Sequence, residues 1–280
     1  MRKIWAIIGA AALTTAVAAC GSPSEQAQDD EGGGDRTTLR VGASPVPHAE
    51  ILQFVQDELA ADAGLNIEIV EFTDYNQPNA ALTEGEIDAN YFQNVPFLDE
   101  YAAANPDADL SWVANVHLEA FGLYAEDIED LADLPDGAQV GVPNDPANLD
   151  RALKLLESEE LLTLDPEAGD AATENDVQDN PKDLELVPVE AAQLPRSLAD
   201  VDAAVVNGNY ALEADLPETA NALAWEDTED NPYGNGLVVR ADDAGSEDIA
   251  TLNELLHSDE VRTFIEEQWQ GVVIPLDAES

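Results

Sequence analysis

The chain has 280 residues, with 60 Asp plus Glu and only 10 Lys plus Arg, which gives a formal net charge of −50 at pH 7. A surface this acidic repels nucleic acid and anionic lipid headgroups, so the composition argues against both as partners. The chain has one cysteine, which excludes a disulfide within the chain.

The N-terminus has the layout of a secretory signal. A short basic start precedes an apolar run over residues 4–19, which is shorter than the roughly 20 residues that a membrane-spanning helix needs. The run leads into VAAC (17–20), the apolar–small–small–Cys pattern of a bacterial lipobox. We therefore predict a lipoprotein signal peptide over 1–19 and lipidation at Cys20. The alternative is a secretory signal that ends near a cysteine by chance.

A tether follows the signal. Residues 21–35, GSPSEQAQDDEGGGD, are too polar and too rich in glycine to bury much apolar surface. We predict that 20–35 is a flexible link between the lipid and a folded part that starts near Arg36. The predicted location is the extracytoplasmic face of the cell membrane. The remaining length, about 245 residues, suits two lobes better than one compact core.

The excess of carboxylates predicts adaptation to high external salt. Beyond the signal, the only lysines are Lys154 and Lys182. At 1 M salt the range of charge repulsion shortens to about 3 Å, so we expect the melting temperature to rise with salt concentration. Thermal unfolding across a salt series measures this. Equal or higher stability at low salt would contradict the prediction.

The folded part opens with a β-α-β pattern. Residues 39–43 predict a strand, apolar residues recur at helical spacing from Ile51 to Leu59, and 65–72 alternates apolar and polar residues like a second strand. This order favours a parallel sheet with helices on its faces. The next predicted elements are a helix over 79–83, a turn and short strand over 84–91, a helix over 95–104, and strands over 112–116 and 121–124 with a break at 117–119.

The rest of the chain predicts a second set of strands and helices. The acidic segment 165–183, broken by Pro and Gly, is predicted to be a surface loop with at most a weak helix. The predicted strands cover 138–142, 184–189, 203–207 and 237–240, and the predicted helices cover 144–159, 196–199, 247–257 and 259–268.

This order of elements predicts that the chain runs from one lobe into a second lobe and back. The crossings would lie near 117–121 and 224–237. We assign 36–118 plus 237–280 to lobe 1 and 119–236 to lobe 2. Two α/β lobes with a cleft between them are the plan of an extracytoplasmic solute-binding protein, and small ligands bind in such clefts.

Motifs of hydrolytic enzymes are missing from the sequence. It contains no Gly-x-Ser-x-Gly, no His-Glu-x-x-His and no glycine-rich phosphate loop. The three histidines, His48, His117 and His257, are far apart in sequence; their spacing does not exclude a zinc site, but the lack of cysteine ligands disfavours one. We predict that the protein is not an enzyme and has no metal and no cofactor.

Arg151 is a candidate ligand residue because it follows a strand and the turn PNDP (143–146) at the start of a helix. It points about 200° away from the start of the apolar stripe of that helix, so we do not predict it in the core. Spacing alone favours a surface arginine paired with Asp150 or Asp145. The alternative is that Arg151 faces the carboxyl edge of the sheet, where helix N-termini attract anions, and holds a carboxylate with two parallel hydrogen bonds.

Seven segments resemble the NlpA family of lipoproteins, the methionine-binding components of bacterial methionine ABC importers. The resemblance runs in order from about residue 39 to the C-terminus. It implies a two-lobe α/β fold of the type 2 periplasmic-binding-protein class, methionine as ligand, and a membrane permease with a cytoplasmic ATPase as partners. The segments are VGASPVPHAEIL (41–52), DYNQPNAAL (74–82), GEIDANYFQNVPFLDEY (85–101), VGVPNDPANLDRALKLLE (140–157), ELVPVEAAQLPRSL (185–198), AVVNGNYAL (204–212) and NPYGNGLVVR (231–240).

The resemblance also implies roles for individual residues. Arg151 corresponds to the arginine that holds the ligand carboxylate, and we expect Arg151→Ala to lose at least about 2 kcal/mol of binding with little change in the melting temperature of the ligand-free protein. Asn207 and Asn235 correspond to asparagines that bond the amino-acid backbone, although without the family they are ordinary turn residues beside glycines. The aromatic wall around the ligand side chain corresponds to Tyr75, Phe92 and Phe97.

The sequence departs from the family pattern at two positions of this wall. Asn94 stands where His is common, and Phe97 stands where Tyr is common. The predicted wall therefore lacks an imidazole and a hydroxyl group. Another apolar amino acid or a short methionine-containing peptide stays open as the ligand.

Overall fold

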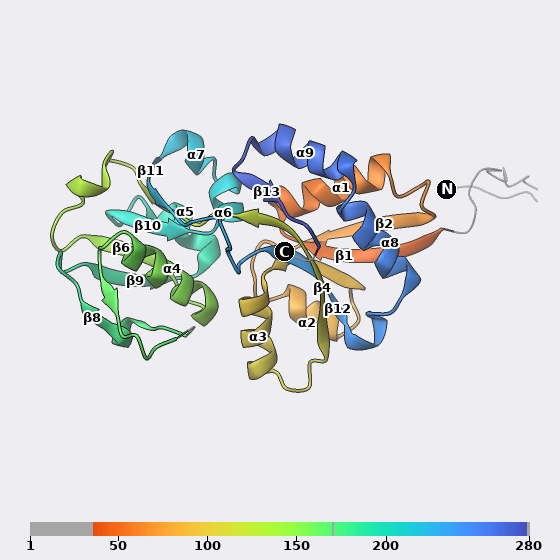
Figure 1. Ribbon diagram of the computed structural model, residues 1–280, viewed down its shortest axis with the longest axis horizontal. Helices are drawn as coiled ribbons and strands as arrows, with labels where there is room; N and C mark the ends of the chain where they lie inside the picture. The colour runs from red at the N-terminus through yellow and green to blue at the C-terminus, as the bar shows by residue number, and fades with distance from the viewer. Residues whose placement is uncertain (1–35, 170, 279–280) are drawn as a thin grey trace, which may run out of the picture. The chain divides into compact units, whose positions relative to one another are not determined.

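The computed structural model describes residues 36–169 and 171–278; the predicted signal peptide, Cys20 and the predicted tether lie outside these ranges. In the described ranges the chain forms two large mixed β-sheets, and helices cover both faces of each sheet (Figure 1). This is the predicted two-lobe α/β fold. No helix in the described ranges has the length and apolar character needed to cross a membrane.

The first sheet has six strands in the order β13-β4-β12-β3-β1-β2. Strand β1 pairs in parallel with β2 and β3, which confirms the predicted β-α-β start, whereas β12 and β13 pair antiparallel with their neighbours. The strands are β1 (Thr37–Ala43), β2 (Leu65–Glu71), β3 (Ala89–Gln93), β4 (Leu110–Glu119), β12 (Asn235–Arg240) and β13 (Val273–Pro275).

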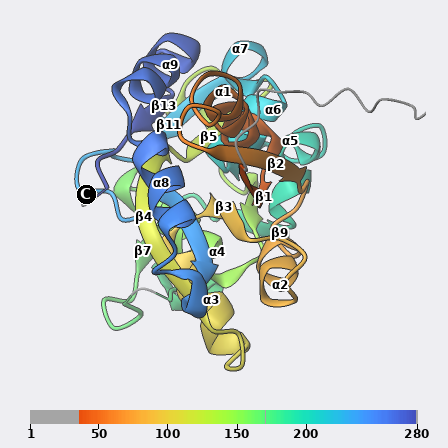
Figure 2. The same cartoon turned by 90° about the vertical axis from the view of Figure 1, so that its right-hand side faces the viewer.

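Helices close both faces of this sheet. A π-helical turn (Pro45–Ala49) leads into α1 (Glu50–Glu58), whose buried Ile51, Leu52 and Val55 pack on one face together with α8 (Glu247–Leu256) and α9 (Asp259–Trp269). Each such fully buried side chain contributes about 1.5–3 kcal/mol. The other face carries a smaller apolar cluster next to α2 (Pro78–Thr83) and α3 (Val95–Ala104), and Figure 2 shows these two helices on the side away from α1 and α9.

The second sheet has five strands in the order β11-β5-β10-β6-β9. The helix α4 (Pro146–Ser158) packs on one face, and the short helices α5 (Leu194–Ser197), α6 (Gly208–Glu213) and α7 (Leu216–Thr219) contribute to the apolar cluster on the other. The strands are β5 (Gly122–Ala125), β6 (Gln139–Pro143), β9 (Glu185–Val189), β10 (Ala203–Val206) and β11 (Asn221–Trp225).

Helix α4 begins where the PNDP turn predicts. The side chain of Asp145 accepts a hydrogen bond of 2.9 Å from the backbone N–H of Asn148, and Pro146 occupies the first helical position, where its missing N–H does no harm. The predicted apolar stripe is buried, as Leu149, Leu153 and Leu156 show. The cap and the stripe together fix the direction in which the remaining face of α4, with Arg151, projects.

The chain leaves the six-stranded sheet after Glu119 and returns to it at Asn235. The predicted break at 117–119 is wrong, because β4 continues to Glu119 with His117 paired to Asn235 and Leu118 paired to Ile274. In the sequence, the polar residues His117 and Glu119 are typical of a break between two strands. In the structure, both side chains are buried.

Other predictions miss short elements. The segment 165–183 contains one short 3₁₀ helix (Glu174–Asp176), but it also contains a strand that was not predicted, β8 (Val177–Asp179), which pairs with β7 (Thr163–Leu164). The helix predicted over 196–199 lies at Leu194–Ser197. Helices α6 and α7 and strands β11 and β13 were not predicted, since three to six residues are too few to show a period.

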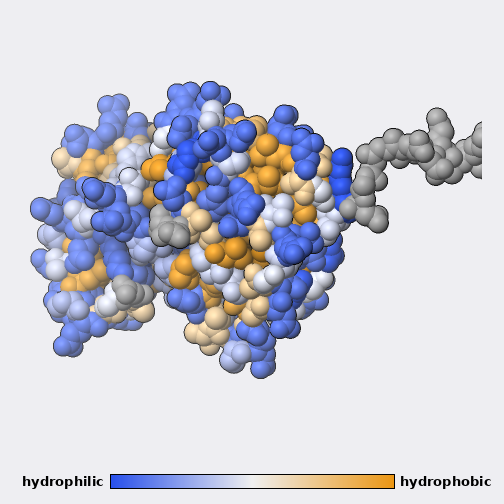
Figure 3. All heavy atoms as spheres, turned by 45° about the vertical axis from the view of Figure 1, so that its right-hand side comes forward, coloured by the Kyte–Doolittle hydropathy of each residue, from blue (hydrophilic) through white to orange (hydrophobic). Residues whose placement is uncertain are grey.

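The surface agrees with the acidic composition. Figure 3 shows a face covered mainly by hydrophilic residues with smaller hydrophobic areas between them. Among the described residues, the exposed large hydrophobic side chains are Val95 and Trp225.

Candidate functional site

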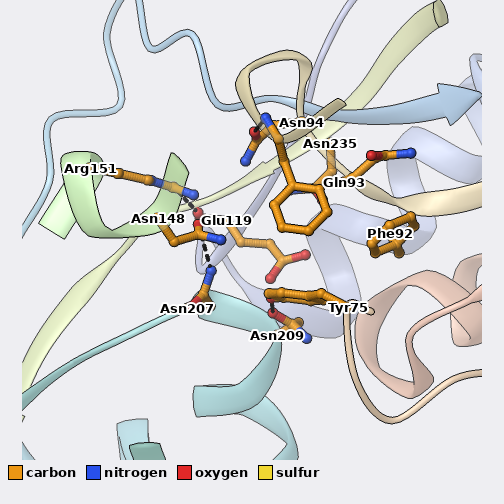
Figure 4. Close-up of a pocket in the computed structure, with 12 residues that line it drawn as sticks. Tyr75, Phe92, Gln93, Asn94, Glu119, Asn148, Arg151, Asn207, Asn209 and Asn235 are labelled. Atoms are coloured by element: carbon orange, nitrogen blue, oxygen red, sulfur yellow. Dashed lines mark hydrogen bonds between the residues drawn. The ribbon is translucent and has the colours of Figure 1, made fainter. Parts of the chain in front are cut away.

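One pocket brings together all seven residues that the sequence predicts to bind the ligand (Figure 4). They come from both sheets and from the helices and loops that follow the strands, and the cavity between them has a volume of about 20 Å³, which is room for about one water molecule. The predicted residues in its wall are Tyr75, Phe92, Asn94, Phe97, Arg151, Asn207 and Asn235. Sequence reasoning missed Gln93, Glu119, Asn148, Gly208 and Asn209.

Arg151 is buried at the wall of this pocket, with 4% of its side chain exposed. Its Nε donates to Oε2 of Glu226 over 2.9 Å, and its Nη2 donates to Oε1 of Glu226 and, over 3.0 Å, to the backbone carbonyl of Glu119. The interpretation that spacing alone favours, a surface arginine paired with Asp150 or Asp145, is therefore wrong. Helical spacing gives the direction of a side chain, but it does not reveal that a distant segment brings Glu226 there.

Two aromatic rings fix the plane of the guanidinium group. Its central carbon lies 4.2 Å from the ring centroid of Phe121 and 4.4 Å from that of Tyr233. Among the guanidinium nitrogens, only Nη1 makes no hydrogen bond to a described residue. Arg151 therefore has one nitrogen left to donate to a ligand.

The amide side chains of the pocket also have unused hydrogen-bonding atoms. Asn207 donates through Nδ2 to Oδ1 of Asn148 over 3.0 Å, and Asn209 accepts through Oδ1 from the hydroxyl of Tyr75 over 2.5 Å. Among the described residues, Oδ1 of Asn207 and Nδ2 of Asn209 are buried and have no partner. An unpaired buried polar atom costs about 1–3 kcal/mol, so these atoms indicate that a polar ligand supplies an acceptor and a donor.

The three predicted aromatic residues form one apolar wall. The ring centroid of Tyr75 lies 5.9 Å from that of Phe92 and 5.6 Å from that of Phe97, and the two phenylalanine centroids are 5.8 Å apart. Tyr75 also contacts Tyr210 of α6, at 4.9 Å between centroids. The wall offers ring faces and edges to an apolar ligand side chain.

Asn94 has a structural task beside its place in the pocket. Its Oδ1 accepts a hydrogen bond of 3.0 Å from the backbone N–H of Phe97 and so caps the N-terminus of α3. Asn is among the best residues for this position. Phe97, whose backbone N–H this cap holds, also lines the pocket, so the cap links the two departures from the family pattern.

Glu119, which lines the pocket, also contacts two buried histidines that do not line it. Its Oε1 lies 2.7 Å from Nε2 of His117 and 3.4 Å from Nε2 of His48, which also lies 3.2 Å from Oδ1 of Asn235. The hydroxyl of Tyr91 bonds to Nδ1 of His117. The sequence held a signal for this cluster, because His117 and Glu119 are two residues apart on a strand and therefore face the same side.

Burial changes the proton affinity of the three titratable groups. Burial raises the pKa of Glu119 to about 7, although electrostatic interactions with His48 and Arg151 and a backbone N–H from Asn209 lower it. Burial lowers the pKa of His48 to about 4 and that of His117 to about 3. Near pH 7 both imidazoles are therefore neutral, and the carboxyl of Glu119 is close to its midpoint.

The same three residues are the one group in the described ranges whose side chains could hold a metal ion. The candidate ligand atoms of His48, His117 and Glu119 all lie within 4.8 Å of one another, and two imidazoles with a carboxylate are a known zinc ligand set. Both Nε2 atoms, however, already lie within hydrogen-bonding distance of side-chain oxygens, so a metal would have to displace these contacts. The absence of a metal remains a prediction.

Gly208 lets helix α6 approach Glu119. A Cβ atom at this position would lie 2.5 Å from Cβ of Glu119 and 3.3 Å from the carbonyl oxygen of Ala120. We expect Gly208→Ala to lower the free energy of unfolding by about 1–3 kcal/mol, because strand β4 and helix α6 must move apart. Chemical denaturation measures this, with Gly245→Ala as the control, since a Cβ there meets no atom within 4 Å. Equal stability of the two variants would contradict the prediction.

Known proteins are similar over nearly the whole folded part. The family model of the NlpA lipoproteins matches residues 39–276. The methionine-binding lipoprotein MetQ of Bacillus subtilis is 36% identical over 281 residues, which cover 99% of each chain. A nutrient-binding protein from Burkholderia cenocepacia bound to methionine is 40% identical with a TM-score of 0.82, over 85% of this chain and all of its own. An ABC transporter periplasmic substrate-binding protein from Coxiella burnetii is 36% identical with a TM-score of 0.80, over the same shares. The chain belongs to the NlpA lipoprotein family.

Proposed function

We propose that this protein is the extracytoplasmic substrate-binding lipoprotein of an ABC importer and that it binds methionine in the pocket between its lobes. The Bacillus relative is named for methionine binding, the Burkholderia relative is bound to methionine, and the Coxiella relative is a transporter component. In this proposal, lipid on Cys20 anchors the chain to the outer face of the cell membrane, and a permease with a cytoplasmic ATPase receives the ligand.

The observation that carries this proposal is the composition of the pocket. It has hydrogen-bond donors for a carboxylate, acceptors for an ammonium group, and an aromatic wall for an apolar side chain. Nη1 of Arg151 and Nδ2 of Asn209 are free to donate to a carboxylate. Oδ1 of Asn207 and the carboxyl group of Glu119 accept from an ammonium group. Asn235 also lines this polar end of the pocket, and its Oδ1 accepts a hydrogen bond from Nε2 of His48.

The aromatic wall receives the side chain. A thioether against Tyr75, Phe92 and Phe97 gains about 0.3–1.5 kcal/mol for each sulfur–ring contact. Asn94 and Gln93 border the same region with amide groups. The wall accepts other apolar side chains as well, which keeps another apolar amino acid or a short peptide as the alternative ligand.

Binding favours closure of the lobes in this proposal, because the ligand contacts both lobes at once. We propose 36–118 plus 237–280 and 119–236 as the two units that move. Tyr75 and Asn209, which belong to different units, already share a hydrogen bond across the pocket. The bound groups are held and oriented and no bond is broken, so we propose no catalytic activity.

Calorimetry with a panel of apolar amino acids and methionine dipeptides tests the proposal. We expect methionine to bind most tightly, and mass spectrometry to find it carried through purification. Tighter binding of leucine or of a dipeptide would favour the alternative ligand. Chemical conversion of a bound compound would contradict the absence of catalysis.

A further inference from the structure

Glu226 does not line the pocket, but it forms an ion pair with Arg151, which does. Its carboxylate accepts from Nε of Arg151 over 2.9 Å and also from Nη2, a bidentate pair of which 9% of the Glu226 side chain and 4% of the Arg151 side chain are exposed. Bidentate pairs of this kind fix geometry as well as charge. The position of the carboxylate therefore determines which edge of the guanidinium group faces the ligand.

The backbone fixes the carboxylate itself. The N–H of Glu226 donates to the carbonyl of Phe121 over 3.0 Å, directly after the β5–β11 pairing, and Oε1 of Glu226 accepts from the N–H of Phe121 over 2.8 Å. Phe121 in turn stacks on Arg151. One residue thus supplies both a ring and a hydrogen-bond donor to the same ion pair.

The return segment between the two sheets encloses the guanidinium group. It starts after Trp225 with Glu226 and includes Tyr233, whose ring centroid lies 4.4 Å from the central carbon of the guanidinium group. Arg151 is therefore held by the segment that connects the lobes as well as by its own helix. With Nε and Nη2 occupied, Nη1 is the nitrogen that remains for a ligand.

We infer that Glu226 is a positioning residue that selects ligands with a free carboxylate, by holding Arg151 so that Nη1 faces the pocket. This inference rests on the proposed binding of an amino acid. It gives Glu226 an effect on the carboxylate end of the ligand and none on the ammonium end, which is bound by Glu119 and Asn207. A residue that only stabilises the fold would not distinguish the two ends.

The test compares methionine with methioninamide, which keeps the ammonium group and the thioether but has no carboxylate. We expect Glu226→Gln to weaken methionine binding by at least about tenfold and methioninamide binding by less than about threefold, so that the preference for the free acid shrinks. Glu226→Asp keeps the charge but is one methylene shorter, so it should show the same loss. Melting curves of each variant establish that the protein tested is folded, and Glu226→Asp serves if the glutamine variant does not fold.

Glu229→Gln is the matched control, because Glu229 is an exposed carboxylate in the same segment. It should bind both compounds as the wild type does. Equal losses for both compounds in the Glu226 variants would reduce Glu226 to a fold-stabilising residue and overturn the inference. Tighter methionine binding by Glu226→Gln would mean that Glu226 competes with the ligand carboxylate, and would also overturn it. If the wild type bound no amino acid, the proposed function would fail first and the inference with it.

Discussion

Replacing Arg151 with alanine is expected to weaken methionine binding by at least about thirtyfold and to destabilise the ligand-free protein as well. The first effect follows from the loss of a charged donor in a buried site, which removes about 2 kcal/mol or more. The second follows from Glu226, whose carboxylate would stay buried without its partner. Removing one member of a buried ion pair costs about 3–5 kcal/mol of stability.

Calorimetry and thermal unfolding of the same preparation separate these two effects. Arg262→Ala is the control, because Arg262 pairs with Asp277 at the surface, where an ion pair contributes only about 0–1 kcal/mol. The sequence analysis expects little change in melting temperature for Arg151→Ala, because it assigns the guanidinium group to the ligand and not to a buried partner within the protein. The structure reverses that part of the expectation. Unchanged affinity of a folded Arg151→Ala protein would remove Arg151 from the ligand site.

The sequence identifies Arg151 as a candidate ligand residue, but it does not predict which residues surround its side chain. The cap at Asp145 and the apolar stripe of α4 are local patterns, so they predict the helix and the direction of Arg151 correctly. Glu226 is 75 residues away in the chain, and nothing local connects it to the helix. Long-range pairs of this kind depend on the crossing of two segments, which periodicity does not encode.

The buried cluster shows a different limit. Because His117 and Glu119 are polar, the sequence predicts a break between strands at 117–119. Strand β4 continues because its backbone pairs with β12 and β13, while both side chains find buried partners. Burial is the main cause of both pKa shifts, and it cannot be known before the fold is known.

Methionine affinity is expected to fall about a hundredfold between pH 8 and pH 5. Burial raises the pKa of Glu119 to about 7, so the ligand-free protein takes up a proton at this carboxyl as the pH falls through that value. An ammonium group needs the ionised carboxylate, and binding must therefore expel the proton. The loss approaches tenfold per pH unit below the pKa and vanishes above about pH 8. The pKa values of His48 and His117, about 4 and 3, keep both imidazoles neutral over this range.

Calorimetry over this pH range with Glu119→Gln identifies the group. The variant should bind weakly at pH 8 and show little further change down to pH 5, because its amide does not titrate. Glu100→Gln is the matched control: burial also raises the pKa of Glu100, but this residue of α3 does not line the pocket, so the variant should keep the slope of the wild type. A wild-type affinity independent of pH would mean that neutral acceptors such as Asn207 hold the ammonium group without Glu119. A slope retained in Glu119→Gln would assign the titration to another residue.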